Sequence, residues 1–136
     1  ERLLKNMQAG QSDFTLTFRK LSSLINKNHE KDWFTLFSNP KKYELTNWMT
    51  EWKNRIELND ANRPVILDQI KTNNPCIIPR NHFIERCITE ALNGDLTLFH
   101  LLLKSLETPY KDNPEFDEFT KPPKSSEIVH QTFCGT

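Results

Sequence analysis

Residues 74–95 read NPCIIPRNHFIERCITEALNGD, and this stretch predicts a helix with sharp boundaries at both ends. Asn74-Pro75 ends any preceding helix, because proline disfavours the α conformation of the residue before it. From Asn81 onward, apolar residues recur at the spacing of a helix with one apolar face. Asn93-Gly94 ends that helix, since glycine readily adopts the left-handed conformation of a C-terminal cap. The apolar residues are Phe83, Ile84, Cys87, Ile88, Ala91 and Leu92.

A second helix is expected directly after this turn. Asp95 is a suitable cap, because a short carboxylate can accept hydrogen bonds from the first backbone N–H groups of a helix. The apolar stripe that follows is wide and contains Leu96, Leu98, Phe99, Leu102, Leu103 and Leu106. If the two helices pack against each other, the buried side chains are Phe83, Cys87, Ala91, Leu98, Leu102 and Leu106.

The earlier residues show further helical patterns, and no stretch predicts a strand convincingly. Residues 1–9 resemble the end of a helix, and Asp13 is placed to cap a helix that continues to Ile25. Asn39-Pro40 is expected to open another helix, and Pro64 a shorter one. The apolar positions are Phe14, Phe18, Leu21 and Ile25, then Leu45, Trp48, Met49, Trp52 and Ile56. Between these two sets, Trp33, Phe34, Leu36 and Phe37 predict an aromatic turn in the core.

The sequence after Leu106 has a different character. Four prolines interrupt it, at positions 109, 114, 122 and 123. One short turn is expected near Phe116 and Phe119, whose rings would anchor it. We therefore predict an all-α fold, with a compact array of five or six helices in residues 1–107. Residues 108–136 are predicted to be a mostly extended tail that ends in Cys-Gly-Thr.

Composition excludes several classes of protein. The 136 residues contain 18 Lys plus Arg and 18 Asp plus Glu, so the basic excess of a nucleic-acid-binding protein is missing. No apolar run approaches the roughly 20 residues of a membrane-spanning helix. Three unevenly spaced cysteines do not form a secreted disulfide framework, which favours a reducing compartment. The chain begins at Glu1 inside an apolar pattern, and we expect it to be a piece of a longer protein.

Catalytic chemistry is not predicted within these residues. The three glycines, Gly10, Gly94 and Gly135, are too far apart to form a phosphate-binding loop. Cys76, His82 and Cys87 lack the paired spacing of a zinc site. Carboxylates are scattered over polar helix faces rather than paired. We therefore predict no catalytic, cofactor-binding or metal-binding residue here.

Several short motifs nevertheless resemble one family in their order and spacing. The chain is similar to the C-terminal region of the selenoprotein O family, called YdiU in bacteria, from about Leu3 to its last residue. The motifs are Asp13–Arg19, Asn74-Pro75, Ile78–His82, Gly94-Asp95, Pro109-Tyr110 and Thr132–Thr136.

This resemblance implies a function for the parent protein. Members of the family are pseudokinase-fold enzymes that transfer AMP from ATP to Ser, Thr or Tyr hydroxyls of proteins, with Mg²⁺ or Mn²⁺. The chain would then be an accessory helical region that supports a kinase-like core, and protein substrates would bind through the parent. The family's nucleotide-binding residues match nothing in these residues. The location implied is cytoplasmic in bacteria and mitochondrial in eukaryotic relatives.

The resemblance also implies a role for Cys134. It occupies the family's third position from the end, which is selenocysteine or cysteine and is linked to redox control through a disulfide with the core. A different reading remains open, in which the chain is a free-standing helical protein-interaction module with no catalytic role. An in-frame kinase-like core upstream of Glu1 would favour the first reading.

We predict that these 136 residues alone neither bind ATP measurably nor transfer AMP, because they contain no glycine-rich loop and no predicted metal site. Calorimetric titration with ATP and Mg²⁺ is the measurement. Saturable binding in the micromolar range would show that the region is more than accessory.

Overall fold

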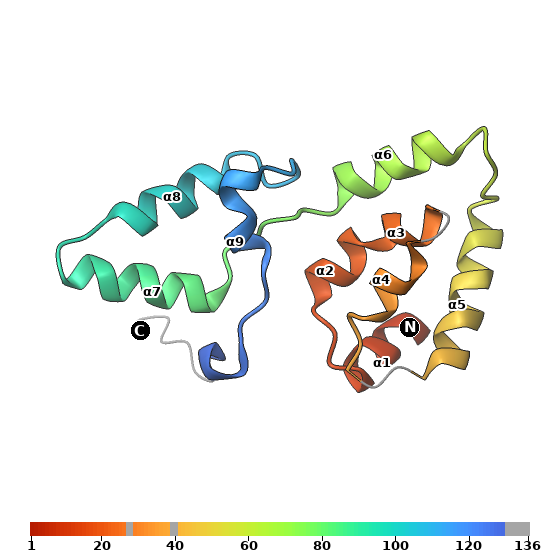
Figure 1. The fold of residues 1–136 in the computed structure, drawn as a ribbon, viewed down its shortest axis with the longest axis horizontal. Helices are drawn as coiled ribbons and strands as arrows, with labels where there is room; N and C mark the ends of the chain where they lie inside the picture. The colour runs from red at the N-terminus through yellow and green to blue at the C-terminus, as the bar shows by residue number, and fades with distance from the viewer. Residues whose placement is uncertain (27–28, 39–40, 130–136) are drawn as a thin grey trace. The chain divides into compact units, whose positions relative to one another are not determined.

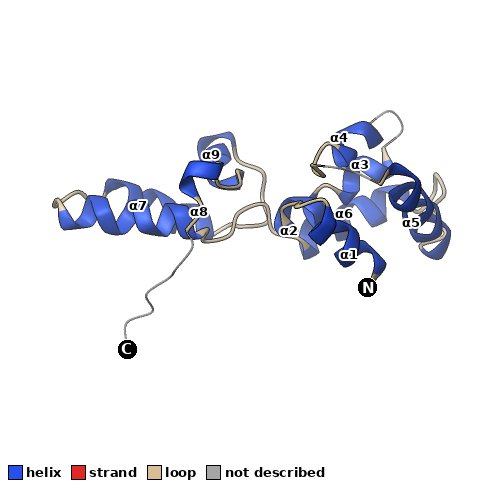
Figure 2. Cartoon of the chain, turned by 90° about the horizontal axis from the view of Figure 1, so that it is seen from below, coloured by secondary structure: helices blue, strands red, loops and turns tan. Residues whose placement is uncertain are grey.

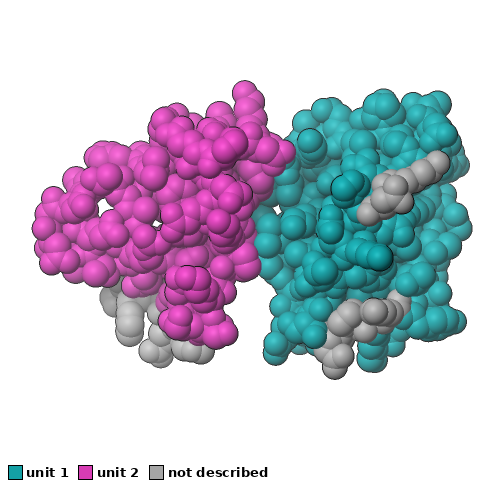
Figure 3. Space-filling model, viewed as in Figure 1, with its two compact units in different colours: residues 1–75 teal, residues 76–136 magenta. Residues whose placement is uncertain are grey.

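The structure is a computed structural model that describes residues 1–26, 29–38 and 41–129. Within these ranges the chain consists of helices and loops, with no strand (Figures 1 and 2). The chain forms two compact units, residues 1–75 (unit 1) and residues 76–136 (unit 2) (Figure 3). The predicted all-α class is therefore confirmed.

Unit 1 contains six helices in its described residues. They are α1 (Arg2–Ala9), α2 (Phe14–Arg19), α3 (Leu21–Ile25), α4 (Glu30–Phe34), α5 (Lys42–Arg55) and α6 (Arg63–Asn73). As expected, Asp13 caps α2, and its carboxylate accepts a hydrogen bond of 2.8 Å from the backbone N–H of Leu16. Asn39-Pro40, expected to open α5, lies outside the described residues, and the first residue of α5 is Lys42.

Trp33 is the centre of the unit 1 core. Its side chain has no exposed surface, and its indole Nε1 donates a hydrogen bond of 2.9 Å to the carbonyl of Thr17. The ring stacks on Trp48, with 5.7 Å between ring centroids, and Trp48 stacks on Trp52 at 5.9 Å. The aromatic turn predicted for the core is confirmed, and the indoles of α5 pack against that core rather than forming a binding platform.

The predicted helix from Phe14 to Ile25 is interrupted at Lys20. The backbone there has φ −83° and ψ 8°, outside the helical range, and α2 ends where α3 begins. Phe14 therefore does not share a face with Leu21, and the prediction of one continuous helical face from Phe14 to Ile25 is wrong. Phe14 is 63% exposed, with its ring 4.8 Å from that of Phe18.

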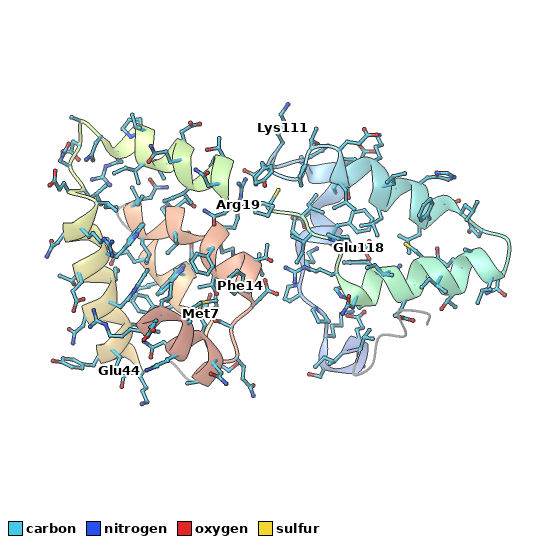
Figure 4. The ribbon with its side chains drawn as sticks, turned by 180° about the vertical axis from the view of Figure 1, so that it is seen from behind. Met7, Phe14, Arg19, Glu44, Lys111 and Glu118 are labelled. Atoms are coloured by element: carbon cyan, nitrogen blue, oxygen red, sulfur yellow. The ribbon has the colours of Figure 1, made fainter. Side chains whose placement is uncertain are left out.

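Arg19 is buried at the end of α6, and the sequence pattern does not predict this burial. Its guanidinium Nη1 donates hydrogen bonds of 2.6 Å to the carbonyl of Lys71 and 2.9 Å to the carbonyl of Asn74 (Figure 4). Carbonyls at the last turn of a helix lack intrahelical partners, and a cation there also complements the helix dipole. Arg19 thus closes the C-terminal end of α6.

Unit 2 begins with a helical hairpin. Its elements are α7 (Asn81–Leu92), α8 (Thr97–Leu106), the 3-10 turn η1 (Pro114–Phe116), α9 (Asp117–Thr120) and a second 3-10 turn, η2 (Ser125–Glu127). The described part of the chain therefore has more helices than the five or six predicted. The additional helices come from the break at Lys20, the separate helix that contains Trp33, and the short helical turns that follow α8.

The turn between α7 and α8 forms as predicted. Gly94 has φ +85°, and its N–H bonds to the carbonyl of Ala91 while the N–H of Asp95 bonds to that of Glu90. This pair of hydrogen bonds is a Schellman motif, which requires the left-handed conformation at the glycine. Asp95 accepts a hydrogen bond of 2.8 Å from the N–H of Thr97, the first residue of α8. Hydrogen bonding from the side chain and then the backbone of Thr97 lowers the pKa of the Asp95 carboxyl.

The unit 2 core is only partly the one predicted. Phe83, Cys87 and Leu102 are buried as expected. Ala91, Leu98 and Leu106 are only half-buried, so the prediction for these three is wrong. The reason is that α7 and α8 leave part of their apolar surface open along the hairpin, as described below.

Prolines separate the short turns after α8, and two phenylalanines anchor them. Phe116 and Phe119 are 3% and 1% exposed, as the sequence predicts, and the Phe119 ring meets that of Phe83 edge-on at 5.0 Å. Arg86 of α7 bonds to the Glu118 carboxylate of α9 at 3.1 Å (Figure 4 labels Glu118). Residues 130–136, which belong to the predicted extended tail, lie outside the described residues.

No helix in the described ranges is both long enough and apolar enough to cross a bilayer.

We predict that Leu24→Ala lowers the free energy of unfolding of unit 1 by about 2–5 kcal/mol, because this side chain is 1% exposed and its removal leaves a cavity. All three tryptophans lie in unit 1, so their fluorescence during denaturant unfolding reports on this unit. Leu4→Ala, at a position 49% exposed, is the matched control. Equal losses for both variants would contradict the core described here.

Candidate functional site

Arg80 marks the start of α7 and is buried. It is the N-cap residue, with the extended backbone that such a position needs, and only 7% of its surface is exposed. Its guanidinium Nη2 donates a hydrogen bond of 3.3 Å to the carbonyl of Thr120 at the end of α9. A buried cation is costly unless polar groups surround it, so this contact joins the start of α7 to the end of α9.

His82, in the first turn of α7, is also 7% exposed. Its ring centroid lies 4.1 Å from that of Phe83. Burial lowers the pKa of this imidazole, while the nearby negative charge of Glu127 acts in the opposite direction and raises it. The neutral ring is therefore favoured, in keeping with the structural role that its sequence position indicates.

A small polar hollow lies beside these residues in unit 2. Its volume is about 290 Å³, and it is lined by Ile78, Pro79, Arg80, Asn81, His82, Pro123, Glu127, Ile128 and Val129. It places a cation, an imidazole and a carboxylate side by side. Among the described residues that line it, none has a hydroxyl, thiol or amine nucleophile, and we assign it no reaction.

Two of the three cysteines are buried. Cys76 and Cys87 are each 5% exposed. The sulfur of Cys76 lies 3.1 Å from the carbonyl oxygen of Pro109 and 3.3 Å from that of Lys111, positions where the thiol donates a hydrogen bond. Burial raises the pKa of the Cys87 thiol, and the charge of Glu90 raises it further. Cys134, the redox candidate, lies outside the described residues.

Nowhere in residues 1–26, 29–38 and 41–129 do three or more His, Cys, Asp or Glu side chains gather as a metal site. Gly94 serves a helix cap, and a glycine-rich loop is missing from the sequence. No step of nucleotide chemistry is derived for these residues.

An apolar groove lies between α7 and α8 in unit 2. Its volume is about 450 Å³. It is lined by Pro79, Ile84, Cys87, Ile88, Ala91, Leu96, Phe99, Leu102, Leu103 and Leu106. Most of these residues lie on the two predicted apolar stripes, which were expected to face each other. The width of the α8 stripe is the sequence feature that could have indicated the groove.

Comparison with known proteins places the chain in one family. Residues 1–107 match the family model described as "Protein adenylyltransferase SelO". The chain belongs to this family, as its motifs indicate.

The particular relatives carry a matching name. The chain is 41% identical over 138 residues to "Protein nucleotidyltransferase YdiU" of Rhizobium johnstonii, and all of it is covered. It is 42% identical over 134 residues to the protein of the same name from Ruegeria pomeroyi, with 98% of the chain covered. These matches span 27% and 26% of the two relatives, so the chain corresponds to about a quarter of their length. No solved structure matched.

Proposed function

We propose that this chain is part of a protein nucleotidyltransferase that transfers AMP from ATP to Ser, Thr or Tyr hydroxyls of other proteins. The observation that carries the proposal is the match of residues 1–107 to the adenylyltransferase family. Identity of about 40% along the whole chain to proteins named nucleotidyltransferases supports it.

Within that protein, these residues have an accessory role. The kinase-like core, which lies in the rest of the polypeptide, binds ATP with Mg²⁺ or Mn²⁺ and carries the catalytic groups. The buried polar residues of the chain are engaged in structure, since Arg19 closes a helix end and Arg80 bonds to Thr120. The relatives compared are bacterial, and a cytoplasmic location is part of the proposal.

Cys134 contributes redox control in this proposal. The resemblance to the family implies that Cys134 pairs with a cysteine of the core, and Cys76 and Cys87 are each 5% exposed. An oxidant such as hydrogen peroxide accepts two electrons and two protons from the two thiols as the disulfide forms. The disulfide restricts the core, and a thiol reductant reverses it.

We predict that the full-length protein transfers label from ATP labelled at the α-phosphate to protein hydroxyls, and none from ATP labelled at the γ-phosphate. AMP carries only the α-phosphate, so the two substrates distinguish nucleotidyl transfer from phosphorylation. Labelled peptides mapped by mass spectrometry identify the acceptor residues. Transfer of the γ-label alone would show that the protein is a kinase and overturn the proposal.

We also predict that Cys134 is the fastest of the three cysteines to be alkylated in the reduced protein, and Cys87 the slowest. The thiolate is the reactive form, and the raised pKa of Cys87 reduces its thiolate fraction at a given pH. After oxidation of the full-length protein, Cys134 becomes protected until a reductant is added.

Timed alkylation read by mass spectrometry measures all three thiols in one sample, with the denatured protein as the control for intrinsic labelling. If Cys134 stays open to alkylation after oxidation, the redox role fails, although nucleotidyl transfer is unaffected.

A further inference from the structure

Helix α8 is apolar around more than half of its circumference. At 100° per residue, its exposed polar side chains Thr97, His100 and Lys104 fall on one narrow arc, while Ser105 is buried. One side of the remaining arc packs onto the unit 2 core through Leu98, Leu101 and Leu102. The other side carries Leu96, Phe99 and Leu103, which are 48%, 45% and 51% exposed. A helix that is apolar on two sides is normally covered on both.

Helix α7 continues this exposed surface. Ile84, Cys87, Ile88 and Ala91 form the opposite wall of the groove, and Ile88 is 49% exposed. The groove of about 450 Å³ has no charged residue in its lining. Figure 3 shows the surface of unit 2 hollowed between the two helices. A continuous apolar hollow of this kind marks a binding surface, whereas single exposed leucines are ordinary.

We propose that this groove is the docking site for an apolar helical segment of the same polypeptide, from the part of the protein outside these 136 residues. The matches cover 27% of the Rhizobium johnstonii relative, so most of that polypeptide lies elsewhere. A segment on the same chain reaches the groove at a high effective concentration, with no loss of free translation. The inference deepens the accessory role proposed above by naming the surface that performs it.

The shape of the groove favours a helix over a second copy of the chain. A hollow between two helices accepts the ridge that side chains at i, i+3, i+4 and i+7 form on a third helix. In a two-fold symmetric dimer the same surface meets itself. Two hollows facing each other would leave a void, and the atoms that line a void lose their contacts.

Leu92 provides a matched control position. It is 84% exposed, follows the groove residues on α7 and is not part of the groove lining. A large apolar residue at position 92 therefore differs from Phe99 or Leu103 chiefly in its place relative to the groove. The docking segment covers Phe99 and Leu103 and leaves Leu92 open.

The test uses the purified full-length protein with the photoreactive amino acid p-benzoylphenylalanine in place of Phe99 or, separately, Leu92. Isotopically labelled and unlabelled protein are mixed before illumination, so that cross-links within one chain are distinguished from cross-links between chains. We expect Phe99→p-benzoylphenylalanine to cross-link within one chain, to peptides outside these 136 residues. Leu92→p-benzoylphenylalanine is expected to give few such products.

Two results would overturn the proposal. Mixed-isotope cross-links from position 99 would show that a second copy covers the groove. Cross-links from position 99 only to residues of this 136-residue region, or equal yields from both positions, would show that no segment of the remaining polypeptide docks there.

A second measurement covers the case in which the photoreactive variant does not fold. Leu103→Glu places a charge under the docked segment, so the full-length protein should unfold at a clearly lower temperature than with Leu92→Glu. Equal unfolding temperatures would contradict docking. The nucleotidyl transfer assay is read separately. Evidence of a docked segment without AMP transfer would leave the inference standing and overturn the proposed function. AMP transfer without a docked segment would overturn the inference and leave the proposed function standing.

Discussion

The apolar surface of α8 is wider than the rest of unit 2 can cover, and the organisation of this unit follows from that constraint. The unit has seven buried apolar side chains in its described core, contributed by the segment before α7, by α7 and α8, and by the turns near Phe116 and Phe119. Phe116 and Phe119 pack those turns against the core of the hairpin. The groove between α7 and α8 remains open. Burial of apolar area is the dominant favourable term in folding, and this open surface is the one to which we assign a docked segment.

Unit 1 meets the same requirement internally. Trp33 is fully enclosed, and the three stacked indoles extend the core along α5. Arg19 is held by two carbonyls at the end of α6, where its charge is compensated by hydrogen bonds instead of water. The two units thus differ in kind: unit 1 closes around its own centre, and unit 2 presents an apolar face.

The parts of the fold that the sequence predicts well are those that local chemistry decides. Asp13 and Gly94 each satisfy backbone groups within a few residues, so their roles follow from residue type and position alone. Phe14, Arg19 and Leu98 depend instead on which distant segment approaches them. An apolar stripe shows that a face requires a partner, but its periodicity does not show how much of the face the available partner covers. For this reason the sequence predicts the apolar stripes of α7 and α8 but not the groove between them.

The difference between local and long-range contacts also explains why the family is recognised from residues that have structural roles. Arg80 and His82 stand in a motif of the family, yet in the structure Arg80 joins the start of α7 to the end of α9, and the His82 ring packs on Phe83. Gly94 in another motif serves a helix cap. Motifs of this kind specify how the hairpin is built and therefore where its apolar groove lies. Under the docking proposal, a region with an accessory role would still influence catalysis, because the geometry of the hairpin would set the position of the docked segment.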